Sequence, residues 1–223
     1  MCNSAAGRQR RVAEPAGYLA AMPEAPVIYL CRHGDTAWSP VRRLAGRTDL
    51  DLTAAGEDKA RGLGARLAGL GFDRVWMSPL LRTRRTAELA GFGARAIADD
   101  RLLEMSFGAY EGKTVQEIRV TRPGWTYLKD GCPDGETADD LGRRADAVLA
   151  ELRALGGTTL IFGHSVVSRV ITARFLDLPP LAGRNFMLAP GAISVLGYDP
   201  VDDAPAIAAW NDRGQAEAPP ARV

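Results

Sequence analysis

The sequence predicts an α/β fold: a three-layer sandwich in which helices cover both faces of a mostly parallel central sheet. Two observations support this prediction. Short apolar runs rich in β-branched or aromatic residues, at 27–31 and 158–162, are typical of buried strands. Such runs alternate with segments whose apolar residues recur at helical spacing. Alternating strands and helices favour a parallel sheet between two helical layers.

The other elements follow from local signals in chain order. Thr53 is a good N-cap residue, and the helical apolar spacing that follows it ends near Gly71. Apolar residues between 137 and 155 have the spacing of an amphipathic helix. We further expect helices over 82–90 and 166–176, and strands over 74–77, 96–98, 193–198 and 206–210.

Length indicates a single domain. The chain has 223 residues, which is enough for one sizeable domain. We place this domain over residues 27–212. Residues 1–26 and 213–223 are expected to be disordered extensions. Met1 and Met22 are both possible translation starts.

The net charge indicates which partners are expected, and the cysteine content indicates the cellular compartment. A formal net charge of +1 provides no general attraction to nucleic acid or to acidic membranes, so neither is expected as a partner. No apolar stretch approaches the roughly 18 residues needed to span a bilayer. Cys2, Cys31 and Cys132 are odd in number and far apart, which indicates reduced thiols and a cytoplasmic protein. The protein is expected to be a monomer or a homodimer.

The two histidines of the chain occupy equivalent places. His33 follows the apolar run 27–31, and His164 follows the apolar run 158–162. In open α/β sheets, ligands bind beyond the carboxyl ends of the strands. We therefore expect the two imidazoles to share one pocket at this edge of the sheet.

Positive charge gathers at the same predicted edge. Arg32 precedes His33, and Arg82 lies where the second strand turns into a helix. Ser165 and Val166 open the helix after His164, so their backbone N–H groups favour an anion. The planar fork of arginine suits phosphate oxygens. These groups would neutralise a phosphate dianion without a metal ion, and we expect no metal and no cofactor.

A histidine in such a pocket can act as a nucleophile. A neutral imidazole attacks phosphorus and forms a phosphohistidine, which water then opens. The leaving alkoxide needs a proton, and Glu104 is the best candidate donor, because repulsion by a bound dianion favours the protonated form of a carboxyl group. Glu111 is the rival candidate, but it is expected to brace the loop.

Five motifs together resemble the signature of the histidine phosphatase superfamily, which includes the cofactor-dependent phosphoglycerate mutases. The first is Arg32-His33-Gly34 within residues 30–36, followed by Trp38. Residues 49–56 are similar to the family's D-x-x-L-T-x-x-G. The others are residues 78–83, residues 103–112 and Gly163-His164-Ser165, and the resemblance covers residues 27–198 in the expected order. Trp38-Ser39 and residues 131–136 are similar to a branch of acid and sugar phosphatases.

The resemblance implies a phosphoglycerate mutase-like fold and a set of roles for the site residues. His33 would be the nucleophile and Glu104 the proton donor. The phosphate ligands would be Arg32, Arg82 and His164. Ser39 stands where many relatives have asparagine, and its hydroxyl is a further candidate ligand. Arg169 follows the second histidine motif as in that branch, and it is either a substrate contact or a charge on the helix surface.

Three other functions compete with a phosphatase. A phosphoglycerate mutase is less favoured, because the segment from Gly112 to Thr137 is short. A serine hydrolase using Ser165 is disfavoured, because Val167 replaces the glycine of G-x-S-x-G and no histidine follows. An inactive phosphate-binding protein is disfavoured, because it would not need His33, Glu104 and His164 together. We therefore expect a metal-independent phosphomonoester hydrolase whose partner is a small phosphorylated metabolite.

Overall fold

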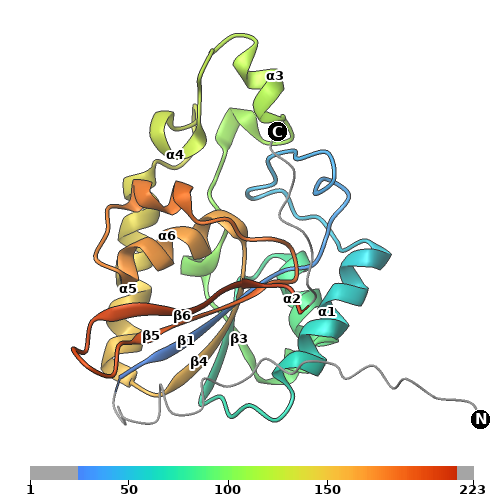
Figure 1. Ribbon diagram of the computed structural model, residues 1–223. Coiled ribbons are helices and arrows are strands. Elements are labelled where there is room, and N and C mark those ends of the chain that lie inside the picture. Colours follow the sequence, from blue (N-terminus) through green and yellow to red (C-terminus); the bar gives the residue numbers. More distant parts are fainter. Residues whose placement is uncertain (1–24, 215–223) are drawn as a thin grey trace, which may run out of the picture.

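The computed structural model describes residues 25–214, which build one six-stranded sheet in the order β3-β2-β4-β1-β5-β6 (Figure 1). The expected α/β fold is confirmed. The expectations for residues 1–24 and 215–223 lie outside the described residues. The strands are β1 (Val27–Arg32), β2 (Arg74–Met77), β3 (Ala96–Ala98), β4 (Thr158–Gly163), β5 (Ile193–Tyr198) and β6 (Pro205–Asp212).

The sheet is parallel from β3 to β1 and antiparallel beyond it. β1 pairs in parallel with β4, and β4 with β2, so these three strands end at one edge. β5 and β6 add an antiparallel hairpin on the other side of β1. β6 is longer than the expected strand over 206–210, because its ladder with β5 extends from Tyr198–Pro205 to Ile193–Asp212.

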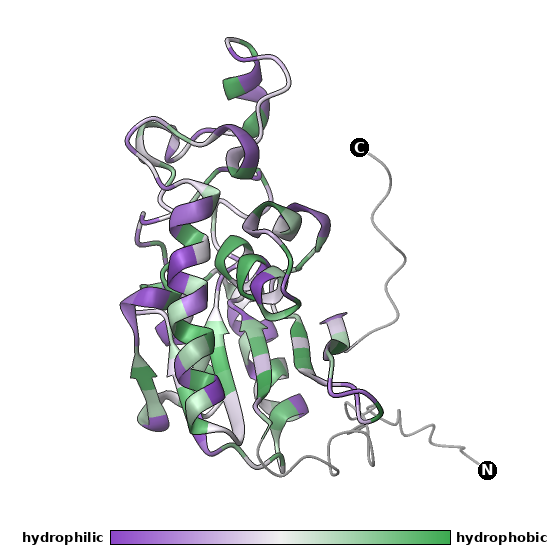
Figure 2. Ribbon diagram, turned by 90° about the vertical axis from the view of Figure 1, so that its left-hand side faces the viewer, coloured by the Kyte–Doolittle hydropathy of each residue, from purple (hydrophilic) through white to green (hydrophobic). Residues whose placement is uncertain are grey.

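Alternation of side chains along β1 produces two separate cores. Ile28 and Leu30 lie in the cluster that includes the buried faces of α5 (Ala138–Leu155) and α6 (Ser165–Phe175). Tyr29 and Cys31 point to the opposite face, in the cluster shared with α1 (Ala54–Leu67) and α2 (Leu81–Leu89). Figure 2 shows the strands mostly hydrophobic and the helices with hydrophilic and hydrophobic positions interspersed. The sheet is thus covered on both faces.

Capping groups define where the helices begin and end. The Thr53 hydroxyl accepts the Gly56 N–H at 3.1 Å and starts α1, as the sequence predicts. The same helix ends at Leu67, short of Gly71, because Ala68 is already extended, with a ψ of 130°, and Gly69 follows with a left-handed φ of 83°. At α5, Thr137 and Asp140 form a capping box, and the helix ends at Leu155.

Residues 105–136, between β3 and α5, form a cap beyond the carboxyl edge of the sheet (Figure 1). It holds only short helices, including α3 (Val115–Arg119) and α4 (Tyr127–Asp130). Trp125 and Leu128 are buried and anchor the cap to the α5–α6 core. Among the described helices, none has the length and apolar character needed to cross a bilayer.

Candidate active site

The structure brings the two histidines together at the carboxyl edge of the sheet. Register pairs Arg32 with Gly163, so β1 and β4 end at the same level. The His33 N–H donates to the Gly163 carbonyl at 3.1 Å, which holds the two strand exits side by side. The centroids of the His33 and His164 rings are 5.2 Å apart, and both side chains are buried.

The contacts of His33 define its tautomer. Its Nδ1 lies 2.6 Å from the Gly34 carbonyl oxygen. A carbonyl only accepts, so Nδ1 carries the proton and Nε2 keeps a free lone pair. Burial, and then the charges of Arg82 and Arg32, hold the pKa of His33 well below its usual range. The ring is therefore neutral, which is the form a nucleophile requires.

Close packing holds the carbonyl that orients His33. A side chain at Gly34 would begin 2.1 Å from the Gly56 carbonyl oxygen, so only glycine permits this approach. The Gly34 N–H also donates to the Thr86 hydroxyl at 3.2 Å. The backbone after β1 is thereby fixed against α1 and α2. This explains the need for glycine directly after His33.

His164 has a protein partner on each ring nitrogen. Arg82 Nε donates to Nδ1 at 3.1 Å, so the ring proton sits on Nε2, which donates to the Ser78 hydroxyl at 2.7 Å. Burial, followed by the charges of Arg82, His33 and two further arginines, lowers the pKa of His164 well below its usual range. Direct donation to phosphate would require the ring to exchange its bond to Ser78.

Arg82 is almost completely buried and joins the site to a distant loop. Besides His164, its guanidinium donates to three backbone carbonyls at 2.8 Å, those of Ala45, Gly46 and Thr48. The side chain is 1% exposed, so these contacts replace water as its polar surroundings. Arg82 thus closes the loop before α1 over the carboxyl edge of the sheet.

Arg32, the residue before His33, has a buried N–H donor without a hydrogen-bond partner. One terminal nitrogen, Nη1, donates to the Leu188 carbonyl, whereas Nε is buried without a hydrogen-bond partner. Burial lowers the pKa of Arg32 to about 10, so the group remains charged at neutral pH. An unpaired buried N–H is costly, and an anion supplied by a ligand would satisfy it. No group of three or more potential metal ligands occurs within residues 25–214.

Glu104 lies at the beginning of α6. Its Oε2 accepts the Val166 N–H, and its Oε1 accepts the Val167 and Met105 N–H groups, all at 3.0 Å. The expectation that the Val166 N–H is open to a ligand is therefore wrong, because a protein carboxylate already satisfies the first turn of the helix. The same contacts place Glu104 beside His164, the residue that precedes α6.

The other predicted site residues, Glu111, Ser39 and Arg169, each contact another group of the protein. Glu111 braces the loop as expected, for it accepts from the Arg47 N–H at 2.9 Å and the Thr48 hydroxyl at 2.8 Å. The Ser39 hydroxyl accepts the Thr36 N–H at 3.0 Å within its own turn. Arg169 links α6 to the cap, donating to the Tyr127 hydroxyl at 2.8 Å.

Sequence reasoning missed two residues of the site. Ser78 follows β2 at the same edge as the histidines, a position that could have identified it, and it accepts from His164. Arg47 lies within the loop that Arg82 holds, and its positive charge acts on the His164 ring. Its Nε is buried without a partner. Only the folded arrangement shows that Arg47 reaches the site, because no strand precedes it.

The unfolding free energy should fall as the pH drops from about 7.5 to about 5.5. Unfolded histidines titrate near 6.5, whereas the fold lowers the pKa of both His33 and His164 well below that value, chiefly through burial. The unfolded state therefore binds more protons, and the stability due to neutral histidine is present above pH 6.5 and lost below it. We expect a loss of roughly 1.4 kcal/mol per histidine, measured by urea unfolding at the two pH values.

The chain offers a direct control for this titration. It holds only two histidines, His33 and His164. In the variant His33→Asn, about half of the pH dependence should disappear, since one of the two titrating groups is gone. An unchanged free energy of unfolding across this pH range in the parent protein would show that the rings are not held neutral.

Comparison with known proteins identifies the class of enzyme. The chain belongs to the histidine phosphatase superfamily, because the family model for branch 1 matches residues 28–213. It is 35% identical to an acid phosphatase of Mycobacterium tuberculosis over 77% of this chain and 86% of that protein. It is 36% identical to the probable phosphoglycerate mutase of Klebsiella pneumoniae over 77% and 84%.

A solved structure supports the same assignment. An open reading frame product of Mycobacterium tuberculosis superposes with a TM-score of 0.79 at 33% identity, covering 85% of this chain and 98% of that one. The family, the acid phosphatase relative and this structure together support a phosphatase. The resemblance drawn from the sequence motifs is confirmed.

Proposed function

We propose that the protein hydrolyses phosphomonoesters through a phosphohistidine on His33. The observation that carries this proposal is the neutral, buried His33, whose Nδ1–H is held by the Gly34 carbonyl, which leaves the lone pair on Nε2. The unpaired buried Nε–H of Arg32 lies on the adjacent residue. A nucleophilic nitrogen and an unsatisfied cationic donor side by side suit a phosphate group.

The reaction has two displacements at phosphorus. In the first, the His33 Nε2 lone pair forms a bond to phosphorus while the bond to the ester oxygen breaks. The leaving oxygen takes a proton from the carboxyl group of Glu104. In the second, water attacks phosphorus and gives a proton to the Glu104 carboxylate while the P–N bond breaks, so inorganic phosphate leaves and both His33 and Glu104 are restored.

Three arginines would supply the charge for this chemistry. Arg32 would bind through its unpaired Nε–H, and Arg82 through the N–H that its four protein contacts leave free. Arg47 adds positive charge near His164. Fixed donors of this kind stabilise the charge that spreads over the phosphoryl oxygens during transfer. His164 holds Arg82 in place and completes the site.

The substrate is proposed to be a small phosphorylated metabolite of the cytoplasm. The cap of residues 105–136 would contact its non-phosphate part, together with Arg169, whose guanidinium is bound to Tyr127 of the cap. Phosphotransfer of the phosphoglycerate mutase type is a second candidate, because a relative at 36% identity carries that name. The two activities differ in the acceptor: a phosphatase transfers the phosphoryl group to water and a mutase to a sugar-acid hydroxyl.

Hydrolysis of p-nitrophenyl phosphate in the presence of EDTA tests the proposal. We expect turnover that EDTA leaves unchanged, and a phosphoenzyme that survives alkaline quenching and is lost in acid, which distinguishes phosphohistidine from a phosphoserine ester. Peptide mapping should place the phosphoryl group on His33. Activity removed by EDTA, or label on any other residue, would refute the mechanism. Phosphoglycerate isomerisation at a rate above hydrolysis would favour the mutase.

A further inference from the structure

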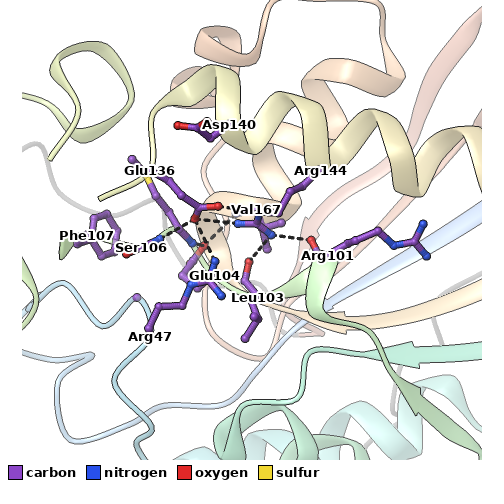
Figure 3. A network of polar contacts seen from close by, with 12 residues as sticks. Arg47, Arg101, Leu103, Glu104, Ser106, Phe107, Glu136, Asp140, Arg144 and Val167 are labelled. Atoms are coloured by element: carbon purple, nitrogen blue, oxygen red, sulfur yellow. Dashed lines mark hydrogen bonds and ion pairs between the residues drawn. The ribbon is translucent and has the colours of Figure 1, made fainter. Parts of the chain in front are cut away.

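Glu136 and Arg144 form a two-point ion pair beside the segment that carries Glu104 (Figure 3). Arg144, on α5, donates from Nε to Glu136 Oε1 at 2.8 Å and from Nη2 to Oε2 at 3.0 Å. Both side chains are only 18% exposed. Parallel arginine–carboxylate contacts are among the strongest and most directional polar interactions. The pair is therefore a rigid unit.

This unit holds the backbone immediately before Glu104. The second terminal nitrogen of Arg144, Nη1, donates to the carbonyl oxygen of Arg101 at 2.6 Å and to that of Leu103 at 2.9 Å. These two carbonyls point toward α5, as Figure 3 shows. A single guanidinium thus fixes the direction from which the chain enters Glu104.

The same unit holds the backbone immediately after Glu104. Glu136 Oε2 accepts the Ser106 N–H at 2.8 Å, and the Glu136 N–H donates to the Ser106 carbonyl at 2.9 Å. Arg47 Nη2 reaches the same oxygen at 3.3 Å. Glu104 is therefore the middle of a short span whose two ends are tied to one ion pair.

From this span the Glu104 side chain crosses to α6. Its two carboxylate oxygens accept the Val166 and Val167 N–H groups. A change in the backbone on either side of Glu104 would move the carboxyl group relative to the leaving oxygen. A proton donor must lie within hydrogen-bond reach of the atom it protonates, so even a small displacement lowers its efficiency.

We propose that Arg144 and Glu136 are positioning residues for the reaction, acting through Glu104 to set where its carboxyl group stands. This inference rests on the proposed function, in which Glu104 protonates the leaving group. A purely structural ion pair makes a different prediction. Its loss would lower stability and reduce activity equally on all substrates, whereas loss of proton donation slows mainly esters with poor leaving groups.

Two aryl phosphates separate these cases. p-Nitrophenolate leaves readily without a proton, and phenolate does not. For Arg144→Gln we expect kcat on phenyl phosphate to fall by about 10- to 100-fold, a part of the effect of a general acid, and kcat on p-nitrophenyl phosphate to fall by less than about threefold. Equal losses on both substrates, or no loss, would overturn the inference.

Arg143 provides a matched control on the same helix. It is exposed and pairs with Asp140 on the surface of α5. Arg143→Gln removes the same charge from the adjacent position and should leave kcat on both substrates within about twofold, since exposed pairs contribute little. A loss on phenyl phosphate equal to that of Arg144→Gln would assign the effect to helix charge and overturn the inference.

A double variant tests whether the effect passes through Glu104. Glu104→Gln alone should slow phenyl phosphate much more than p-nitrophenyl phosphate. Adding Arg144→Gln to it should bring no further loss on phenyl phosphate, because residues that act as a unit are not additive. Multiplied losses would show that Arg144 acts independently of Glu104.

Amide exchange gives a readout that needs no activity. In Arg144→Gln the Val166 and Val167 amides should exchange about tenfold faster, because their acceptor Glu104 is less firmly held, and Arg143→Gln should not change them. Glu136→Gln keeps side-chain size and serves if Arg144→Gln does not fold. Unchanged exchange would overturn the positioning role. By contrast, failure to trap phosphohistidine on His33 in the parent enzyme would refute the proposed function alone.

Discussion

Replacing His33 with alanine should reduce kcat on p-nitrophenyl phosphate by at least about 10³-fold, with the fold retained. The variant removes the nitrogen that is proposed to form the bond to phosphorus. The neighbouring cations, Arg32 and Arg82, keep their places, since neither is bonded to the His33 ring. Steady-state kinetics, with circular dichroism to check the fold, measures the effect.

Two further measurements distinguish loss of the nucleophile from loss of the pocket. Inorganic phosphate should still inhibit or bind the His33→Ala variant, because the anion-binding groups remain. Added imidazole should restore part of the activity, since the buried space left by the side chain can admit a free nucleophile of the same shape. Full activity in the variant would assign the attack on phosphorus to another group.

Arg82→Gln should cost both stability and activity. The guanidinium, itself almost completely buried, satisfies the carbonyls of Ala45, Gly46 and Thr48 and the Nδ1 atom of His164. Glutamine cannot replace these four contacts. Because each unsatisfied buried group costs about 1–3 kcal/mol, we expect the unfolding free energy to fall by at least about 3 kcal/mol, measured by urea denaturation.

Arg82→Gln should also lower kcat and raise KM. Loss of a fixed cationic donor costs about 10²–10³-fold in kcat, and displacement of the Ala45–Thr48 loop adds to KM. Arg84, exposed on the same helix, is the matched control, and Arg84→Gln should change neither quantity appreciably. A stable, fully active Arg82→Gln protein would show that the loop closes without this side chain.

Local sequence patterns were sufficient to predict the two strands that carry the histidines and the edge of the sheet at which the site lies. An apolar run that ends in a histidine shows both a buried strand and the edge at which its side chain lies. Two such runs therefore predicted that His33 and His164 share one end of the sheet. Arg82 was indicated by its place where the second strand turns into a helix, and Glu104 by the need for a proton donor. The motif resemblance supported both, although the loop that holds Glu104 has no periodic signal.

Contacts between distant segments could not be predicted in this way. Nothing near Glu104 in the sequence indicates that its carboxylate caps the first turn of α6. The link between Glu136 and Arg144 depends equally on how the cap folds back onto α5. The end of α1 was also missed, because the apolar spacing continues to Leu70 while the backbone is already extended at Ala68. Such features depend on tertiary packing and on single backbone torsions.

The division between sheet edge and cap has a consequence for how this enzyme could diversify. The groups proposed to handle phosphorus are anchored by strand ends and buried hydrogen bonds, and altering them endangers folding. The cap is one contiguous stretch of short helices and loops, held to the body by a few aromatic and aliphatic anchors such as Trp125. If the cap contacts the substrate as proposed, changes within it that spare Glu136 would alter substrate choice while the groups at the sheet edge keep their positions.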